Sequence, residues 1–569
     1  PNDQLNKGNI PTLETKITEN LFKSHKTSIA VIIDFVVVSC DDLQKGTHDI
    51  TKTLAEKIEA KKKRKFSGFI ASNSDFFDPK DVVDVDMVTG EDIEKADKEI
   101  LKKFEDDPIF KGDSADFSIE KLNLLTIQQI CLGSRLKKAD YLVIGNQDFS
   151  GLTTKEQKYC IEPAGLGIHY YLVEDKVNLK KLLANSNKAL QVYTLNNFDF
   201  TAIANNPTHT FGFMLYGGNE TPTFEYEYID EEEAGKVMLC QIGDIKTFSH
   251  LTLRLGVKQD NDTKKYQTNN LAAIKRLGVL MLDVDGLGAI FKETNFASLA
   301  SYSAFSRHLD YFFLGYLNTL WNQNKKYKDH SQIIYAGGDD LLLVGRWDVM
   351  VELAETIQAQ LLQWSCQTAI KQAPKVSVSG GVAVVTHKFP VMKAKEMAES
   401  AEKDAKKYKI TVDGVQLPKN AITLWGVSLN WSYEYATVKA LKEQIKHYIE
   451  GYKTVFMTLQ EYYYQHSFAE KEGWKKEVND GKKPSIKDRY TWKYSYQTRW
   501  RVAYYIAKTQ ERHRHKNKDL WDFLEDVKQG IFTNAYDGRG LQGSHNYFTL
   551  LNLAIRWAEL DYRTNYKKN

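Results

Sequence analysis

The sequence predicts an α+β fold, because strand-like and helix-like patterns alternate in one central region. Val279–Leu282 is a continuous apolar run, as in a strand that is covered on both faces. A second apolar stretch is interrupted by Gly337, Gly338, Asp339 and Asp340, which predicts a tight hairpin between two strands. Apolar spacing predicts helices over 302–322, 350–364 and 391–408, and a further strand over 375–385. The order strand, helix, strand, strand, helix, strand is that of a ferredoxin-like βαββαβ unit.

The predicted hairpin has the composition of a nucleotidyl-transfer site. Two adjacent carboxylates repel each other, so Asp339 and Asp340 favour a bound cation. Gly337 and Gly338 have no Cβ, so a phosphate or a base can approach their backbone closely. An ordinary β-turn has the same composition, so the hairpin alone does not decide between the two interpretations.

A second pair of acids follows the first predicted strand. Asp283 and Asp285 are two residues apart, so on a strand they point to the same face. Beside the hairpin they place three or four carboxylates around one point. Such a group suits Mg²⁺, which binds through one or two carboxylates plus substrate phosphates. Two such ions activate an attacking hydroxyl and stabilise a leaving pyrophosphate.

At this point the chain resembles the large subunit of type III CRISPR effector complexes, and the Csm-type version in particular. The resemblance rests on motifs of its second palm domain: LGVLMLDVDGLGAIF (277–291), FSRHLDYFF (305–313), IIYAGGDDLLLVG (333–345), VSVSGGVAV (376–384) and AEKDAKKYK (401–409). Three earlier motifs agree with it: KKKRKFSGF (61–69), LGSRLKKADYLVIG (132–145) and GLGIHYYLV (165–173). The resemblance therefore spans most of the chain.

The resemblance implies an activity and a set of residues. Members of the family convert ATP to cyclic oligoadenylate messengers when the complex binds target RNA. Mg²⁺ or Mn²⁺ is the implied cofactor, with Asp283, Asp339 and Asp340 as its ligands and as the catalytic residues. The implied nucleotide-binding residues are Gly337, Gly338, Asp285, Ser306, Arg307 and Lys406. The sequence departs from the family at Gly286, where Asn is usual.

Other functions stay open at this stage. The same metal site can join AMP to another small molecule, such as S-adenosylmethionine, because only the acceptor pocket differs. A structural subunit with an idle palm is a second alternative, although close carboxylates without a metal cost stability. A free-standing diguanylate-type cyclase is a third, but its hairpin usually reads Gly-Gly-Asp/Glu-Glu-Phe.

The resemblance also predicts the domain organisation and the partners. We expect the end of a first palm-like domain at 1–70, an inter-palm linker at 71–265, the second palm at 266–428 and a helical domain at 429–569. No HD nuclease activity is expected from this chain, which reads as half of a split subunit or as part of a longer protein. A separate chain would then supply the rest of the first palm and an HD domain. Guide RNA, target RNA and the handle-binding and small subunits are the other implied partners.

Composition sets further limits. Five cysteines form no CxxC pair, so we expect no structural zinc, and their use suits a reducing cytoplasm. No apolar run reaches the ~20 residues of a membrane span. The apolar run at 28–38 is shorter and predicts a core strand.

Two C-terminal segments invite a prediction about contacts. Segment 487–516 alternates Arg and Lys with Trp and Tyr, which suits RNA contact, but the helical spacing favours aromatic residues packed in a bundle. Segment 547–562 is amphipathic, which predicts docking on another subunit.

Overall fold

The computed structural model describes most of the chain. It covers residues 10–25, 29–45, 48–67, 70, 82–94, 119–146, 160–161, 167–201, 203–204, 207–218, 221–231, 237–260, 263–268, 274–291, 299–365, 376–412, 415–482, 492–532 and 545–565. Contacts divide the chain into two compact units, residues 1–220 with 288–315 and residues 221–287 with 316–569. The four ranges predicted from the sequence do not coincide with these units and stay a prediction.

The first unit is built on a five-stranded sheet with the order β4-β5-β3-β6-β7. Its core joins Val143 and Val192 on the sheet to Leu179 on α9, and Asp175 caps the start of that helix. The bounds in this unit are α2 Ile10–His25, α3 Cys40–Lys45, α4 His48–Lys62, β1 Val82–Val85, β2 Asp92–Glu94, a 3₁₀ turn Ile119–Lys121, α7 Leu124–Lys138, β3 Tyr141–Gly145, β4 Cys160–Ile161, β5 His169–Val173, α9 Lys176–Ala184, β6 Gln191–Leu195, β7 Thr210–Met214 and α12 Leu299–Asp310.

The strand predicted over 28–38 is wrong. Residues 29–39 have no regular structure. Two lysines of α4 donate hydrogen bonds to the backbone of this segment. Lys61 donates to the carbonyl of Ile33 at 2.6 Å, and Lys57 donates to the carbonyl of Phe35 at 3.1 Å. These ammonium groups satisfy backbone acceptors that a strand would have paired with another strand.

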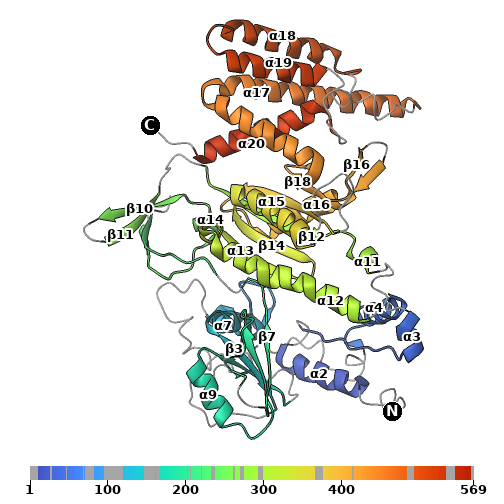
Figure 1. The fold of residues 1–569 in the computed structure, drawn as a ribbon, viewed down its shortest axis with the longest axis vertical. Helices are drawn as coiled ribbons and strands as arrows, with labels where there is room; N and C mark the ends of the chain where they lie inside the picture. The colour runs from blue at the N-terminus through green and yellow to red at the C-terminus, as the bar shows by residue number, and fades with distance from the viewer. Residues whose placement is uncertain are drawn as a thin grey trace. The chain divides into compact units, whose positions relative to one another are not determined.

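The second unit contains the predicted ferredoxin-like palm (Figure 1). Its six-stranded sheet has the order β13-β14-β12-β15-β18-β19, in which β12, β13, β14 and β15 are antiparallel neighbours. The bounds are β12 Arg276–Val284, α13 Leu317–Gln323, α14 Lys325–His330, β13 Ser331–Gly337, β14 Asp340–Arg346, α15 Trp347–Trp364, β15 Val378–Thr386, α16 Val391–Lys407, β18 Ala421–Leu424 and β19 Val427–Asn430. The helix predicted over 302–322 is found as α12, a π-helical turn over Tyr311–Tyr316 and α13.

Smaller elements complete the unit before the C-terminal helices. A four-stranded sheet has the order β10-β11-β8-β9, and a hairpin joins β16 to β17. Their bounds are β8 Glu227–Glu231, β9 Val237–Cys240, α10 Phe248–Leu251, β10 Leu255–Asp260, β11 Thr263–Thr268, β16 Lys409–Val412 and β17 Val415–Pro418. The short helix α11 Leu287–Ile290 begins at the last residue of segment 221–287 and continues into the first unit.

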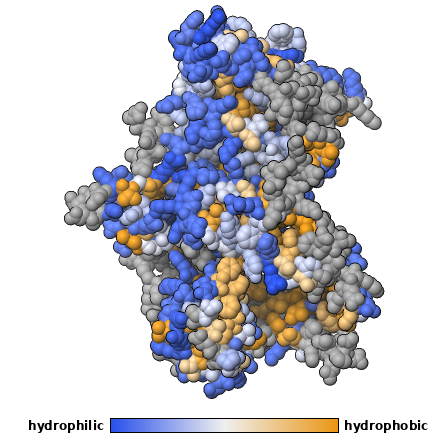
Figure 2. Space-filling view, in the orientation of Figure 1, coloured by the Kyte–Doolittle hydropathy of each residue, from blue (hydrophilic) through white to orange (hydrophobic). Residues whose placement is uncertain are grey.

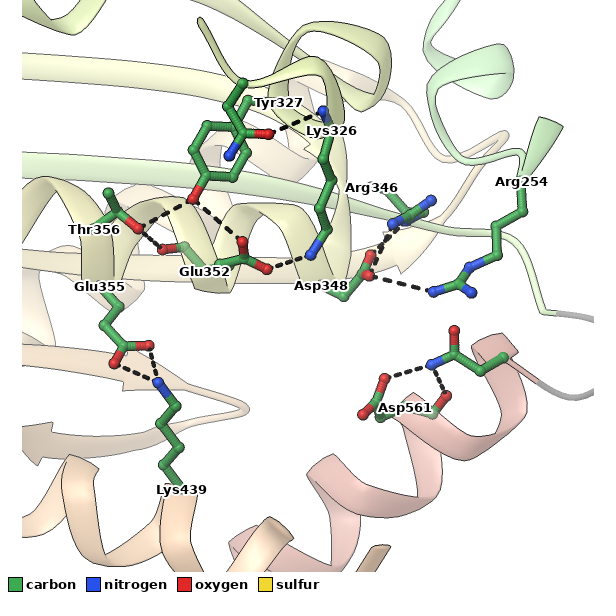
Figure 3. Close-up of polar contacts among 12 residues, drawn as sticks. Arg254, Lys326, Tyr327, Arg346, Asp348, Glu352, Glu355, Thr356, Lys439 and Asp561 are labelled. Atoms are coloured by element: carbon green, nitrogen blue, oxygen red, sulfur yellow. Dashed lines mark hydrogen bonds and ion pairs between the residues drawn. The ribbon is translucent and has the colours of Figure 1, made fainter. Parts of the chain in front are cut away.

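Helix α15 covers one face of the palm sheet and ties it to the helices that follow. A Cβ at Gly278 would lie 2.8 Å from Trp347 Cα, so only glycine lets α15 lie this close to β12. Glu355 on α15 accepts from Lys439 on α17 at 2.6 and 2.8 Å, as Figure 3 shows. At the start of α15, Asp348 accepts from Arg346 at 2.6 and 3.0 Å. The sheet and the helical region are thus joined by charged contacts along one helix.

The C-terminal region is helical, as predicted, and its described residues form α17 Ala436–Asn479, α18 Tyr496–His513, α19 Lys518–Phe532 and α20 Tyr547–Asn565, preceded by a π-helical turn over Trp431–Tyr435. Helix α20 packs on α17 and on the palm, where Trp347 donates to Thr564 Oγ1 at 2.9 Å. Leu551, Ala554 and Ile555 are fully buried. The apolar face of 547–562 thus packs within this chain, and docking of this segment on another subunit stays a prediction.

For segment 487–516 the sequence left two interpretations, RNA contact and packing of the aromatic residues in a bundle. The structure describes residues 492–516 of this segment. Trp492 is buried, as the bundle interpretation predicts. Tyr496, Trp500 and Tyr504 are exposed, so the prediction that the aromatic residues pack in the core is wrong for these three. None of the helices in the described ranges combines the length and the apolar content that a bilayer crossing needs.

Candidate active site at the palm hairpin

The Gly-Gly-Asp-Asp segment forms the predicted hairpin. Gly337 pairs with Asp340, so Gly338 and Asp339 are the two turn residues. Gly338 has φ +63°, a conformation that glycine adopts without strain and that two-residue hairpins require. A Cβ at Gly338 would meet nothing within 4 Å, so the backbone there is open to a ligand. The carbonyl of Asp339 accepts from the amide of Val284 at 3.2 Å, which fixes the turn to the end of β12.

Asp283 and Asp340 lie together because of strand register. They are directly opposite each other on β12 and β14 and therefore share a face of the sheet. Partial desolvation at the turn and the nearby charges of Asp283 and Asp339 raise the pKa of Asp340 to about 6, although part of its side chain is exposed. Close carboxylates of this kind are stabilised by a positive charge, and part of that charge comes from the protein itself.

Lys406 supplies this charge. Its ammonium forms an ion pair with Asp283 and a second one with Glu402 at 3.1 Å. Burial opposes the charged form of Lys406, but the bonds to these carboxylates outweigh it and raise the pKa. Lys406 therefore does not lie on a solvated face of the helix, because its side chain is only 28% exposed.

Close packing of α16 on the sheet places Lys406 there. A Cβ at Gly381 would lie 2.5 Å from both Ala401 Cβ and the Glu402 amide nitrogen, so β15 and α16 approach each other only with glycine at this position. Ala394, Ala398 and Ala405 are fully buried on the same helix. Small residues on both elements thus bring the last turn of α16 over Asp283.

Asp285 has a different environment from Asp283. Its carboxylate is buried and accepts from Ser377 Oγ at 2.6 Å, Ser379 Oγ at 3.0 Å and the Asn420 amide at 3.0 Å. Burial raises its pKa, and these three hydrogen bonds partly offset the rise. This arrangement favours a positioning role: Asp285 holds β15 and the segment before β18 in place under the site. Its assignment to the nucleotide-binding residues stays a prediction.

The sequence interpretation missed Lys419 and Asn420. Both have left-handed backbones, with φ values of 62° and 50°. Non-glycine residues rarely adopt this region and do so mostly at functional or tightly held sites. The Asp285 carboxylate holds the second of them, and a Cβ at Gly286 would lie 3.8 Å from Lys419 Nζ. Thus a lysine lies beside the glycine at which the chain departs from the family.

The structure brings together only part of the predicted site. Asp283, Asp340 and Lys406 lie in contact, with Gly337, Gly338 and Asp339 at the adjoining turn. Ser306 and Arg307 lie on α12, in the first compact unit, and the exposed Arg307 donates through Nε to the Ser303 carbonyl at 3.4 Å. Their role toward a nucleotide stays a prediction.

The acidic residues at the hairpin supply some of the oxygen ligands that a divalent cation needs. Over the described residues, no group of three or more His, Cys, Asp or Glu side chains is arranged as a metal site. The expected ligand set of Asp283, Asp339 and Asp340 stays a prediction. However, the pair Asp283 and Asp340 offers carboxylate oxygens of the kind that Mg²⁺ prefers, and Mg²⁺ commonly takes only one or two of them from a protein. The carboxylate pair and its repulsion thus fit such an ion.

Comparison with known proteins agrees with this geometry. The family described as Cas10/Cmr2, second palm domain, matches residues 276–414, and the family described as Csm1 subunit domain B matches residues 1–82. The first match contains the hairpin, β12 and α16.

Curated relatives match smaller parts of the chain. A protein from Methanocaldococcus jannaschii, named CRISPR system single-strand-specific deoxyribonuclease Cas10/Csm1 (subtype III-A), is 34% identical over 190 residues, which are 31% of this chain and 23% of the relative. Its namesake from Streptococcus thermophilus is 26% identical over 198 residues, or 32% of this chain and 24% of the relative. The alignments thus span about a quarter of the length of these relatives.

Solved structures share the fold. A Csm1–Csm4 cassette in complex with one ATP has a TM-score of 0.53 and 15% identity, covering 96% of this chain and 59% of the other. The cassette in complex with cA3 also has a TM-score of 0.53, at 14% identity, covering 96% of this chain and 58% of the other. These structures show the fold alone. The two family matches and the curated relatives confirm the resemblance seen in the motifs: the chain is similar to the Csm-type large subunits of the Cas10/Csm1 family.

Proposed function

We propose that the palm of this chain joins ATP molecules into cyclic oligoadenylates within a type III CRISPR complex. The observation that carries the proposal is the pair Asp283 and Asp340, placed opposite each other beneath a Gly-Gly-Asp-Asp turn and faced by Lys406. The solved relatives contain ATP or cA3, a substrate and a product of this kind of reaction.

The proposed step is a nucleotidyl transfer. The 3′-hydroxyl oxygen of one ATP attacks the α-phosphorus of a second, a new P–O bond forms, pyrophosphate leaves with its electron pair, and the hydroxyl proton passes to solvent. A divalent cation held by Asp283 and Asp340, with Asp339 beside them, would lower the hydroxyl pKa and offset phosphate charge. Lys406 holds Asp283 in place and adds positive charge where phosphates approach. Gly338 leaves room for the nucleotide against the backbone, whereas a Cβ at Gly337 would lie 3.3 Å from the Tyr335 hydroxyl.

The proposal extends to partners. We infer that guide RNA, target RNA and the handle-binding and small subunits surround this chain. We also infer that a further palm completes the nucleotide pocket, because two ATP molecules must meet. These inferences rest on family membership and on the names of the Csm1–Csm4 structures.

A product assay on the assembled complex tests the activity. Target RNA, ATP and Mg²⁺ are added, and products are identified by mass spectrometry with and without S-adenosylmethionine. We expect cyclic oligoadenylates, and none from the double variant Asp339→Ala, Asp340→Ala. The matched control is Asp404→Ala, which removes an exposed acid from α16 of the same palm and should leave product formation intact. Unchanged product in the double variant contradicts the proposal, and an AMP conjugate formed only with S-adenosylmethionine points to the ligase alternative.

A further inference from the structure

Helix α18 displays three aromatic side chains to solvent. Tyr496, Trp500 and Tyr504 are 60%, 61% and 66% exposed. They are four residues apart, so they follow one face of the helix, about 6 Å apart along its axis. The opposite face carries Val502 and Ile506, both fully buried, where α18 packs on α17 and α19. The three rings are therefore not needed for the core, and exposing them costs apolar burial without an evident structural gain.

The exposed rings are ordered by contacts with one another and with cations. The rings of Tyr496 and Trp500 are edge to face, with centroids 6.0 Å apart. Lys508 Nζ lies 5.5 Å from the centroid of Tyr504 and donates to its hydroxyl at 3.2 Å. Tyr496, Trp500 and Tyr504 therefore form a row along the helix, and the Lys508 ammonium group follows at its end.

A hollow lies beside this row, between α18 and α19. Its volume is about 500 Å³, and the lining residues are Tyr496, Arg499, Trp500, Ala503, Lys528, Gln529 and Phe532. The guanidinium of Arg499 lies 5.9 Å from the centroid of the Phe532 ring. Planar rings and a guanidinium thus line a space that is open to a flat ligand.

The segment that carries the three rings is rich in basic residues, although the chain as a whole has a formal net charge of only +3 and α19 beside it carries four acids, Asp519, Asp522, Glu525 and Asp526. Residues 496–516 contain six arginines and lysines (Arg499, Arg501, Lys508, Arg512, Arg514 and Lys516) and a single acid, Glu511. The surface of the C-terminal helices is largely hydrophilic in Figure 2. A partner that is flat, apolar on its faces and negatively charged complements this surface, whereas a purely apolar protein patch does not.

We propose that this face of α18 binds single-stranded RNA. Bases stack on Tyr496, Trp500 and Tyr504, and Arg499, Arg501 and Lys508 contact the phosphates. Stacking needs unpaired bases, so a duplex, whose bases face each other, is excluded from the rings. The site lies outside the palm and takes no part in nucleotidyl transfer. Only the choice of RNA over DNA rests on the proposed function, because that function places the chain in an RNA-guided complex.

Fluorescence anisotropy with the purified full chain tests the proposal without ATP, so its outcome is independent of the palm activity. The probe is a labelled RNA of about 15 nucleotides, compared with its duplex and with DNA of the same sequence. The double variant Trp500→Leu, Tyr504→Leu keeps apolar contact but removes the rings, and we expect its affinity for the RNA strand to fall about tenfold or more. The conservative double variant Trp500→Phe, Tyr504→Phe keeps a ring at each position and should retain affinity within about threefold.

A matched control separates this face from exposed aromatic residues in general. Phe468 on α17 is 69% exposed but has the exposed acid Glu472 one turn away, so Phe468→Leu should leave RNA affinity unchanged. Unchanged RNA affinity in the Trp500→Leu, Tyr504→Leu variant overturns the proposal. So does a loss of assembly with other subunits at unchanged RNA affinity, which would make the face a protein interface. A loss confined to the DNA strand overturns the choice of RNA.

Discussion

The palm strands and the C-terminal helices differ in what decides where a side chain points. Asp283 and Asp340 share a face because side chains alternate along a strand and the register pairs these two residues. In the helices, apolar and aromatic residues at helical spacing are buried in α20 but partly exposed in α18. Helix α20 is covered by α17 and by the palm, so Leu551 and Ile555 are fully buried, whereas α18 leaves Trp500 61% exposed. A strand's face is thus set by local geometry, but a helix's face is set by its neighbours.

Asp285→Ala is the change with the largest expected effect on the palm. It leaves the hydroxyls of Ser377 and Ser379 and the amide of Asn420 without their buried acceptor. We expect the free energy of unfolding to fall by roughly 3–5 kcal/mol, measured by urea denaturation. Asp285→Asn keeps one acceptor oxygen and should lose less. A loss below about 1 kcal/mol in the Ala variant would mean that local register alone holds this region.

A pair of truncations tests the comparison of the two helices. Leu551→Ala on α20 removes a fully buried side chain and should lower the free energy of unfolding by about 2–5 kcal/mol. Trp500→Ala on α18 removes a larger but exposed side chain and should change it by no more than about 0.5 kcal/mol. Comparable losses in the two variants, measured in the same urea titration, would show that α18 is packed like α20.

The sequence was sufficient for the palm and for the centre of its site. A continuous apolar run, the double glycine and the acids beside them predict β12, β13 and β14 and the neighbouring positions of Asp283 and Asp340. The ion pair between Lys406 and Asp283 agrees with a family motif but depends on the close approach of α16 at Gly381. That approach is a tertiary contact, which periodicity does not reveal.

Residues held by non-local contacts were not predictable. The left-handed backbones of Lys419 and Asn420 are stabilised by Asp285, which is 135 residues away from Asn420 in the chain. The expected strand over 28–38 fails because lysines from α4 occupy its carbonyls. The exposure of Tyr496, Trp500 and Tyr504 depends on which helices pack around α18. In each case, a contact between distant segments overrides a local pattern.

Two glycines of the palm allow a smaller test of local against non-local control. At Gly381 a Cβ would lie 2.5 Å from Ala401 Cβ, so Gly381→Ala should lower the free energy of unfolding by about 1–3 kcal/mol through overpacking. At Gly338 a Cβ meets nothing within 4 Å, and only the positive φ is strained, so Gly338→Ala should lower it by about 1 kcal/mol. Gly338→Asn should lower it less, because Asn tolerates this backbone. A larger loss at Gly338 than at Gly381 would mean that the local turn conformation matters more for stability than the packing of α16 on β15.

The smallest expected effect is a pH dependence at the acid pair. In the folded state the pKa of Asp340 is raised from 3.8 to about 6, so its contribution to stability is fully present below 3.8 and is lost as the pH rises through about 6. Asp340→Asn does not suffer this loss, so its Tm relative to the unmutated chain should be higher at about pH 8 than at about pH 4. Because Asp340 is exposed at the turn, solvent screening keeps the difference under about 1 kcal/mol. Thermal unfolding with a chelator present measures it, and Asp404→Asn, an exposed acid on α16, should give the same Tm difference at both pH values. If Asp340→Asn behaves like that control, the neighbouring carboxylates do not repel each other in the folded protein, and register alone does not build the site.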